Sequence, residues 1–178
     1  MMNILITVAH PDDETIGMGG TIKKLSKNNE ITLCVMSDGA SAQYDDKKMI
    51  KVRQDACKKA GKILGISKFH FLNFPDMKLD SIPHVEMNKE LEKIIKKINP
   101  KILYSTSYND LNKDHQKVFE SCSVISRPIS SKIKKFLCFE MGGRNKTPFN
   151  PNTYVDISKE LSFKLKALNQ YKTEINPF

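Results

Sequence analysis

The sequence predicts an α/β fold in which a parallel, Rossmann-like sheet is sandwiched between helices. Apolar strands alternate with amphipathic helices along the 178 residues, and this alternation is typical of parallel sheets joined by right-handed crossovers. The strands are nearly continuous in apolar character, as expected of strands covered on both faces. No internal repeat or low-complexity linker interrupts the pattern, so we expect one domain spanning residues 1–178.

The first elements are a strand, a helix and a second strand. A continuous apolar run predicts a strand over residues 3–8. Helical spacing predicts a helix over 15–27, which we expect to bury Ile16, Thr21, Ile22 and Leu25. The next apolar run predicts a strand over 30–36, followed by a polar loop over 37–46 that contains the turn signal Asp38-Gly39.

The middle of the chain continues the alternation. A long amphipathic helix is predicted over 47–64, ended by Gly65, with an inward face of Met49, Val52, Ala56, Ala60 and Ile63. A third strand is expected over 68–73. The helix expected over 85–98 stops at Asn99-Pro100, because a residue before proline disfavours helical backbone.

The second half completes the sheet and its cover. A fourth strand is expected over 102–105, then a polar loop over 110–115 and a helix over 116–125. The C-terminal part is expected to form a fifth strand, a loop, a short extended piece and a last helix, over 135–140, 141–152, 153–157 and 159–171.

Composition describes a globular protein without a membrane span. Hydrophobic residues make up 39% and charged residues 28%, which excludes a disordered chain. No apolar run approaches the ~20 residues of a membrane span, and the N-terminus lacks the features of a signal peptide. The four cysteines are widely spaced, which favours reduced thiols that act as small hydrophobes. We therefore expect a cytoplasmic protein.

The formal net charge of +9 raises the question of an acidic partner. Lysines are spread through every expected helix and do not gather in one patch. Tryptophan is absent, so the chain offers few aromatic side chains on which nucleic-acid bases could stack. We expect no nucleic-acid partner. The charge fits a solvated lysine-rich surface, and it leaves open a phosphorylated or nucleotide-linked substrate.

Acidic and histidine residues concentrate in two polar loops. The run A-H-P-D-D-E, residues 9–14, directly follows the first strand, and a second polar loop over 108–115 follows the fourth. An unpaired buried carboxylate is costly, so acids packed this tightly usually face water, a metal or a substrate. In the commonest doubly wound order these two strands are neighbours, and their loops then face each other across one crevice.

The two loops together offer two histidines and a carboxylate. His10 comes from the first loop and His115 from the second. With an open position for water this set suits a catalytic zinc ion, and iron(II) can occupy it as well. Asp12 and Asp13 are adjacent outside a helix and so point in different directions. One can bind the metal while the other takes a proton from water.

The run A-H-P-D-D-E and the later N-D-L-N-K-D-H, residues 109–115, resemble the PIG-L/LmbE family of zinc-dependent N-acetylglucosaminide deacetylases. Further similarities in the second long helix, in Ser126-Arg127-Pro128 and in the C-terminal half extend the resemblance over nearly the whole chain. It implies hydrolysis of an N-acetyl group from an amino sugar, with zinc bound by His10, Asp13 and His115 and Asp12 as the general base.

Neighbouring residues receive roles from the same resemblance. Asn112 stands where many family members carry a histidine that stabilises the transition state. Its amide can donate a hydrogen bond to an oxyanion but cannot deliver a proton, so Asp12 is also expected to protonate the leaving amine. Asp114 and Asp110 are candidates to orient an imidazole.

Four polar residues are assigned to the surroundings of this site. Arg53 and Asp110 are candidates for binding the substrate, since a guanidinium suits paired oxygens of a phosphate or sugar. Glu14 is expected to support the site from the first helical turn, where the helix dipole favours a carboxylate. Asp76 follows the third strand and is expected near the crevice rim, with a substrate role left open.

Family members usually continue past the segment that matches residues 176–178, through a stretch that helps close the sugar pocket. The sequence given stops there, so it lacks the counterpart of that stretch. We expect metal binding to survive this loss. Either this is a truncated form with an incomplete substrate pocket, or a partner chain completes the site, which leaves a homo-oligomer open.

Other functions stay open at this point. One is a metal-dependent hydrolase of a different amide or of a phosphoester. A second is a non-catalytic or shortened paralogue that binds sugar or metal without turnover, although Asp12 is intact and a pure binder needs no base. A third is nucleic-acid binding, which rests on the net charge alone.

Overall fold

The structure is a computed structural model that describes residues 1–129, 131–143 and 145–174. The segment 176–178, where we expected the family sequence to continue, lies outside the described residues.

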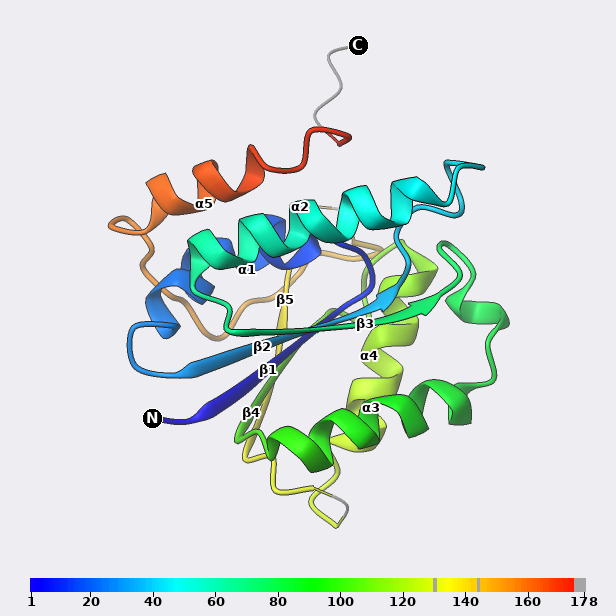
Figure 1. Ribbon diagram of the computed structural model, residues 1–178. Coiled ribbons are helices and arrows are strands. Elements are labelled where there is room, and N and C mark those ends of the chain that lie inside the picture. Colours follow the sequence, from blue (N-terminus) through cyan, green and yellow to red (C-terminus); the bar gives the residue numbers. More distant parts are fainter. Residues whose placement is uncertain (130, 144, 175–178) are drawn as a thin grey trace.

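The described chain is built around a parallel sheet (Figure 1). Its five strands lie in the order β3-β2-β1-β4-β5, and every pair of neighbours is parallel. The strands are β1 (Asn3–Val8), β2 (Glu30–Ser37), β3 (Lys68–Phe74), β4 (Ile102–Thr106) and β5 (Lys135–Phe139). This confirms the predicted Rossmann-like fold, with β1 and β4 side by side.

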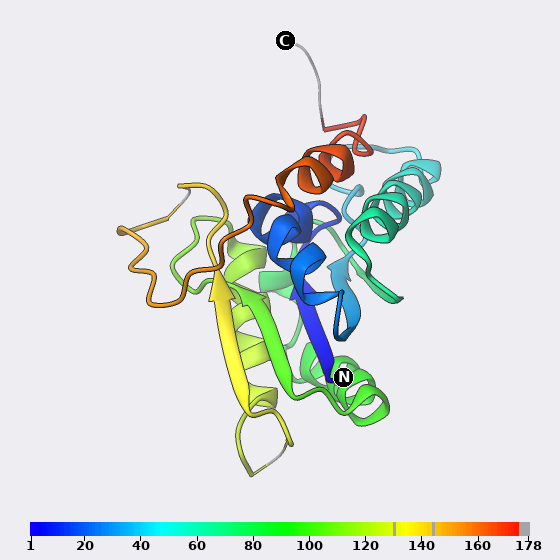
Figure 2. The ribbon, with the colours of Figure 1, turned by 90° about the vertical axis from the view of Figure 1, so that its left-hand side faces the viewer.

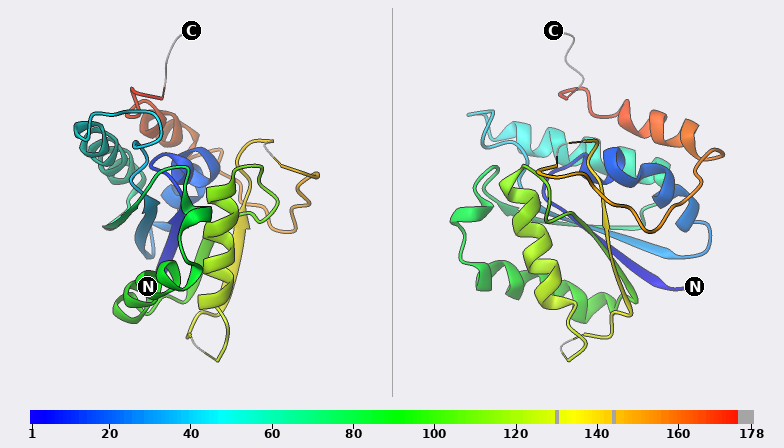
Figure 3. Two further views of the ribbon diagram at one scale, coloured as in Figure 1. Left: turned by 90° about the vertical axis from the view of Figure 1, so that its right-hand side faces the viewer. Right: turned by 180° about the vertical axis from the view of Figure 1, so that it is seen from behind.

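Helices cover both faces of the sheet, as Figures 1 and 2 show. On one face lie α1 (Asp13–Leu25), α2 (Lys48–Leu64) and α5 (Leu161–Leu168). On the other lie α3 (His84–Ile98) and α4 (Lys113–Ile125), with the short 3₁₀ turn η1 (Leu79–Ser81) nearby. Figure 3 shows α5 running alongside α1 and α2.

Strand β1 shows why the apolar runs are continuous. Ile4, Ile6 and Val8 belong to the core under α1, α2 and α5, whereas Leu5 and Ala9 belong to the core under α3 and α4. Successive side chains of a strand point to opposite faces, so a strand covered twice needs apolar residues at every position.

The buried faces of the first two helices differ from the prediction. Ile16 is 41% exposed instead of buried, because the first turn of α1 buries Asp13, Glu14 and Thr15 and so turns Ile16 to the other side. The backbone of α1 is also non-helical at Met18. Val52 is 46% exposed, and α2 instead buries Arg53 and Cys57. The expected inward stripe of α2 is therefore shifted by about one residue.

Three boundaries also differ. Helix α4 begins at Lys113, inside the expected loop, because the Asn112 side chain caps it by accepting a hydrogen bond from the Asp114 backbone N–H. The extended piece expected over 153–157 does not join the sheet. Helix α5 is shorter than the expected 159–171. Gly65 ends α2 as predicted, in the left-handed conformation that glycine favours.

The β1–β4 pairing positions the loops that carry the motifs. The two strands pair in register from Ile4 with Ile102 to Thr7 with Ser105, so their C-terminal ends lie together. The segments 9–14 and 107–115 therefore begin beside each other. In the part of the chain that the structure describes, no helix is long and apolar enough to cross a membrane.

Candidate metal centre and active site

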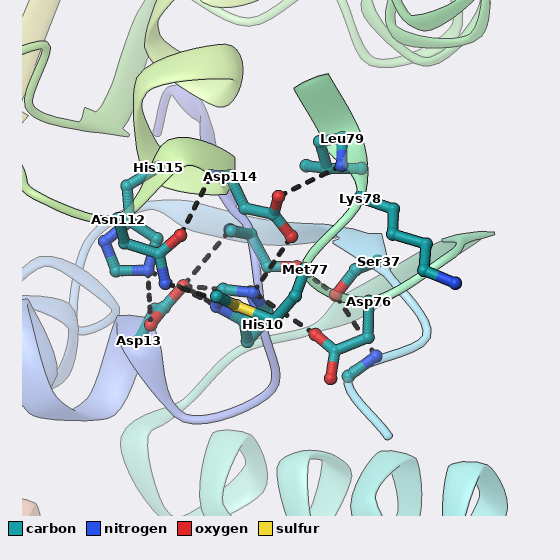
Figure 4. A network of polar contacts seen from close by, with 12 residues as sticks. His10, Asp13, Ser37, Asp76, Met77, Lys78, Leu79, Asn112, Asp114 and His115 are labelled. Atoms are coloured by element: carbon teal, nitrogen blue, oxygen red, sulfur yellow. Dashed lines mark hydrogen bonds and ion pairs between the residues drawn. The ribbon is translucent and has the colours of Figure 1, made fainter. Parts of the chain in front are cut away.

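His10, Asp13 and His115 meet where the β1 and β4 loops face each other. His115 Nε2 lies 3.3 Å from His10 Nδ1 and 3.4 Å from Asp13 Oδ1. His10 Nδ1 lies 3.5 Å from Asp13 Oδ2. Figure 4 shows the three side chains pointing toward one another. Two nitrogens and one carboxylate oxygen this close together form a donor set that fits a divalent metal such as zinc.

Each imidazole of this cluster has a carboxylate behind it. The other nitrogen of His115, Nδ1, lies 2.7 Å from Asp110 Oδ2. The other nitrogen of His10, Nε2, lies 3.2 Å from Asp114 Oδ2 and 3.3 Å from Asp76 Oδ1. An outer N–H bonded to a carboxylate leaves the inner nitrogen with its lone pair free for a metal.

A second candidate donor group shares one of these histidines. His10, Asp76 and Asp114 also place ligand atoms close together. That group uses His10 Nε2, whose proton is needed for the hydrogen bond to Asp114 when Nδ1 binds a metal. Asp114 also accepts a hydrogen bond from the Leu79 backbone N–H at 3.0 Å. The group is therefore better explained as the support that orients His10.

Without a metal, the two histidines of the cluster hold protons. Burial disfavours the charged form of His10, but the contacts with Asp114 and Asp13 outweigh it and raise its pKa to about 10. For His115, burial is outweighed by the charge of Asp13 and the hydrogen bond to Asp110, and the pKa rises to about 9. Burial opposes ionisation of Asp13, yet the two imidazoles hold its pKa far below the usual range.

The Asp13 carboxylate also shapes the loop that carries it. Its Oδ2 accepts hydrogen bonds from the backbone N–H groups of Ala9, at 3.2 Å, and His10, at 2.9 Å. The side chain thus folds back over the end of β1 and closes the turn into α1. This explains why an acid follows the histidine at this spacing.

Asp12 lies beside the cluster and faces the same cavity. The cavity has a volume of about 480 Å³, and Asp12, His10, Asp13 and His115 all line it. Asp12 Oδ2 lies 3.6 Å from Arg53 Nη2. Burial and the charge of Asp13 raise the pKa of Asp12 well above its usual range, although Arg53 acts in the opposite direction. Its backbone is unusual for a non-glycine residue, with φ 130° and ψ −28°.

Asn112 reaches the same cavity from the start of α4. Its amide oxygen is used in capping the helix, so the amide nitrogen is the part that faces the site. That nitrogen lies 3.7 Å from the sulfur of Met77, a weak acceptor. A hydrogen-bond donor therefore lines the same cavity as the His10, Asp13 and His115 cluster.

Arg53 and Asp110, the two candidates for substrate binding, both contact other groups of the protein. The two carboxylate oxygens of Asp110 contact His115 and the Asn112 backbone N–H, and Asp110 does not line the cavity. Arg53 is buried and lies between Asp12 and Glu174, with Nη1 3.3 Å from Glu174 Oε1. The geometry gives Asp110 the role of orienting His115, and it gives Arg53 a carboxylate partner on each side.

Glu14 is fully buried behind Asp12. One oxygen, Oε2, accepts the Asp12 backbone N–H at 3.2 Å. The other, Oε1, accepts hydrogen bonds from the Thr15 hydroxyl at 2.6 Å and the Tyr171 hydroxyl at 2.5 Å. Burial raises the pKa of Glu14, and these three donors act against that rise. The predicted supporting position of Glu14 thus includes a partner 157 residues away in sequence.

Several residues of the site were not predicted. Asp76 was expected only at the rim, but it is buried against His10. Met77, Tyr171 and Glu174 were not assigned to the site at all. Met77 has a left-handed backbone, φ 55°, which a sequence does not reveal at a non-glycine position. Tyr171 lies in the C-terminal half that resembles the family, whereas Glu174 carries no motif. Only the packing of the chain after α5 brings the two close to the site.

The doubly wound sheet, with a His-Asp-His cluster at the ends of β1 and β4, defines an α/β protein of the LmbE-like type. Residues 5–125 match the model of the PIG-L family, described as GlcNAc-PI de-N-acetylase. The chain belongs to this family, as the sequence predicted.

Individual relatives agree with this assignment. The chain is 28% identical over 189 residues to diacetylchitobiose deacetylase of Thermococcus kodakarensis, covering 96% of this chain and 69% of that protein. It is 30% identical over 185 residues to the uncharacterized deacetylase YaiS of Escherichia coli, covering 96% and 90%. The solved structure of N,N'-diacetylchitobiose deacetylase from Pyrococcus horikoshii superposes with a TM-score of 0.77 at 26% identity, covering 98% and 71%.

Proposed function

We propose that this protein is a metal-dependent N-deacetylase that hydrolyses the N-acetyl group of an N-acetylglucosamine-type amino sugar. The observation that carries the proposal is the position of Asp12 beside the His10, Asp13 and His115 cluster on one cavity. Membership of the PIG-L family and two relatives named as deacetylases support it. We also propose that residues 1–178 form a single domain.

In this proposal His10, Asp13 and His115 hold the metal, which is zinc or iron(II). Such an ion supplies Lewis acidity, which polarises a carbonyl oxygen and lowers the pKa of water. Asp110 and Asp114 fix the two imidazoles through their outer nitrogens, so that the inner nitrogens stay oriented toward the metal.

Asp12 serves as the general base and then as the general acid. Its carboxylate lines the cavity next to the cluster, where it can take a proton from the attacking water. The same carboxyl group can then deliver that proton to the nitrogen of the leaving amine. Among the acids of the described cavity wall, Asp13 and Asp76 contact an imidazole, whereas Asp12 and Glu174 contact Arg53. Asp12 directly precedes Asp13 in the chain, which makes it the candidate beside the cluster.

Asn112 serves as a hydrogen-bond donor to the developing oxyanion. Its amide nitrogen has only a weak partner, the Met77 sulfur, so donating to a carbonyl oxygen of the substrate costs little. This role matches the capacity of an amide, which can donate a hydrogen bond but cannot act as an acid.

Among the described residues that line the cavity, Arg53 is the only lysine or arginine, and it already contacts Asp12 and Glu174. An anionic group on the sugar would also face the bound metal ion, so the charges of the wall do not select between an uncharged and a phosphorylated or nucleotide-linked sugar. The volume of about 480 Å³ is typical of a small-molecule site.

The test is metal content together with release of amine and acetate from N-acetylglucosamine and N,N'-diacetylchitobiose. We expect about one metal ion per wild-type chain and turnover of at least one sugar. His115→Ala should lose metal and activity, Asp12→Asn should keep metal and lose about a hundredfold or more in kcat, and His70→Ala on β3 should behave like wild type. A metal-loaded wild type without turnover would favour the non-catalytic alternative.

A further inference from the structure

We propose that Tyr171, acting through Glu14, holds Asp12 in the backbone conformation needed for catalysis. The segment after α5 would then be part of the active-site support, although it carries no catalytic group. This inference rests on the proposed function, in which Asp12 is the general base. It assigns to Tyr171 and Glu14 the role of positioning residues.

Asp12 needs such support because its backbone is in a region that residues other than glycine rarely adopt. Its φ of 130° and ψ of −28° persist only where the surroundings impose them. The Asp12 carbonyl accepts hydrogen bonds from the Thr15 and Ile16 N–H groups, both at 2.9 Å. The Asp12 N–H donates to Glu14 Oε2. Both sides of the residue are thus fixed by the first turn of α1.

Glu14 is held by hydrogen bonds rather than by an ion pair. It is fully buried, and within the described ranges no lysine or arginine forms an ion pair with it. Its orientation depends on the Thr15 hydroxyl, the Tyr171 hydroxyl and the Asp12 N–H. Without the Tyr171 hydroxyl, the buried Glu14 carboxylate keeps only two of its three hydrogen-bond donors. We expect the carboxylate then to rotate away from the Asp12 N–H.

Tyr171 is well placed to impose this order because its own side chain is buried and α5, which precedes it, packs closely on α1. The residue is 2% exposed and lies in the core shared by α1 and α2. Glycines of α1 allow the close approach: a Cβ at Gly20 would lie 2.6 Å from Ile157 Cδ1, and one at Gly19 would lie 3.1 Å from Lys164 Cγ. Figures 1 and 3 show α5 lying along this helix.

The same segment reaches Asp12 by a second route. Glu174 contacts Arg53 at 3.3 Å, and Arg53 lies 3.6 Å from the Asp12 carboxylate. Tyr171 therefore acts on the Asp12 backbone and Glu174 on its side chain. Two independent contacts from one short segment converge on one residue.

The experiment compares Tyr171→Phe with Tyr154→Phe, a matched hydroxyl deletion at an exposed tyrosine whose hydroxyl bonds only to Pro151 among the residues described. Kinetics of the metal-loaded protein and amide hydrogen exchange over residues 9–16 are measured. For Tyr171→Phe we expect kcat to fall about ten- to a hundredfold, the loss typical of a hydrogen bond to a charged group. KM and metal content should stay unchanged, and exchange over 9–16 should be faster. Tyr154→Phe should match wild type.

Glu14→Met supplies an independent variant and a double-mutant cycle. Its side chain has no oxygen that can accept the Asp12 N–H, so we expect the same changes in kcat and exchange. The double variant should be no worse than either single one, because both act through one contact. Additive losses, or exchange over 9–16 that is unchanged in Tyr171→Phe, would overturn the proposal. If wild type does not deacetylate but the exchange still changes, the proposed function fails and the positioning contact stands.

Discussion

His115 Nδ1 lies 2.7 Å from Asp110 Oδ2, and this contact fixes which nitrogen of His115 faces the cluster. Asp110 precedes α4 and also accepts a hydrogen bond from the Asn112 backbone N–H. This second hydrogen bond fixes the orientation of the carboxylate that contacts His115. The ring of His115 therefore presents Nε2 to His10 and Asp13 in a set orientation. The candidate metal-binding cluster is in this way organised by hydrogen bonds within the chain itself.

Asp110→Asn should weaken metal binding without unfolding the protein. The amide keeps the shape of the side chain but loses the charge that strengthens the bond to His115. We expect the dissociation constant for zinc to rise about ten- to a hundredfold, measured by competition with a chelator. Asp80→Asn, at an exposed position of η1, is the control and should leave zinc affinity unchanged. Equal affinities for Asp110→Asn and wild type would contradict this role.

Asn112→Ser separates the two functions of Asn112. Serine also caps helices, so α4 should keep its first turn and the melting temperature should stay within about 2 °C of wild type. The amide donor is lost, however, and we expect kcat to fall about tenfold or more with metal content unchanged. An unchanged kcat would show that the Asn112 amide does not contact the reacting carbonyl.

Gly39→Ala should destabilise the protein through the A-H-P-D-D-E loop. Gly39 has a φ of +65°, and a Cβ there would overlap the ring of Pro11. We expect a loss of about 2 kcal/mol in the free energy of unfolding, from urea titration. Gly143→Ala is the matched control: its φ is +82°, but no described neighbour approaches a Cβ there, so only the backbone cost of about 1 kcal/mol applies. Equal losses would exclude the contact with Pro11.

The stability of the metal-free protein should fall as the pH rises from about 6.5 to 10. The folded-state pKa values of His10 and His115, about 10 and about 9, lie above the ordinary value of 6.5. A raised pKa stabilises the fold fully below the unfolded value, and this contribution is lost as the pH rises through the folded value. Asp12 and Asp76, whose pKa values are also raised, act in the same direction above the ordinary range of a carboxyl group.

Melting temperatures with chelator, taken across this pH range, test the expectation. Metal binding requires neutral imidazoles and releases their protons. The metal-loaded protein should therefore show little or no such decline over the same range. A metal-free protein whose melting temperature rises between pH 7 and 9 would show that the surrounding carboxylates do not raise the pKa values of the two histidines.

Much of the fold could be predicted because local patterns determine it. Continuous apolar runs gave the strands, helical spacing gave most helices, and the preference for neighbouring central strands brought the loops of β1 and β4 together. The residues at the centre of the candidate site, His10, Asp13 and His115, follow directly from those two loops. Their convergence needs only that the β1–β4 pair forms in register.

The remaining features depended on tertiary packing. The first turn of α1 buries Asp13 and Glu14 and leaves Ile16 exposed, and α2 buries Arg53, which lies beside Asp12, in place of Val52. Local spacing records which residues share a helical face, but it does not record which neighbour that face will meet.

The sequence by itself determined the strands, the family and the residues that can bind a metal. Only the tertiary structure decided that Asp114 contacts His10 and not the neighbouring His115, and that Tyr171 reaches Glu14. The reason is physical: a strand or motif is defined by residues a few positions apart, whereas these contacts join segments whose distance is set by how α4, η1 and the chain after α5 pack on the sheet.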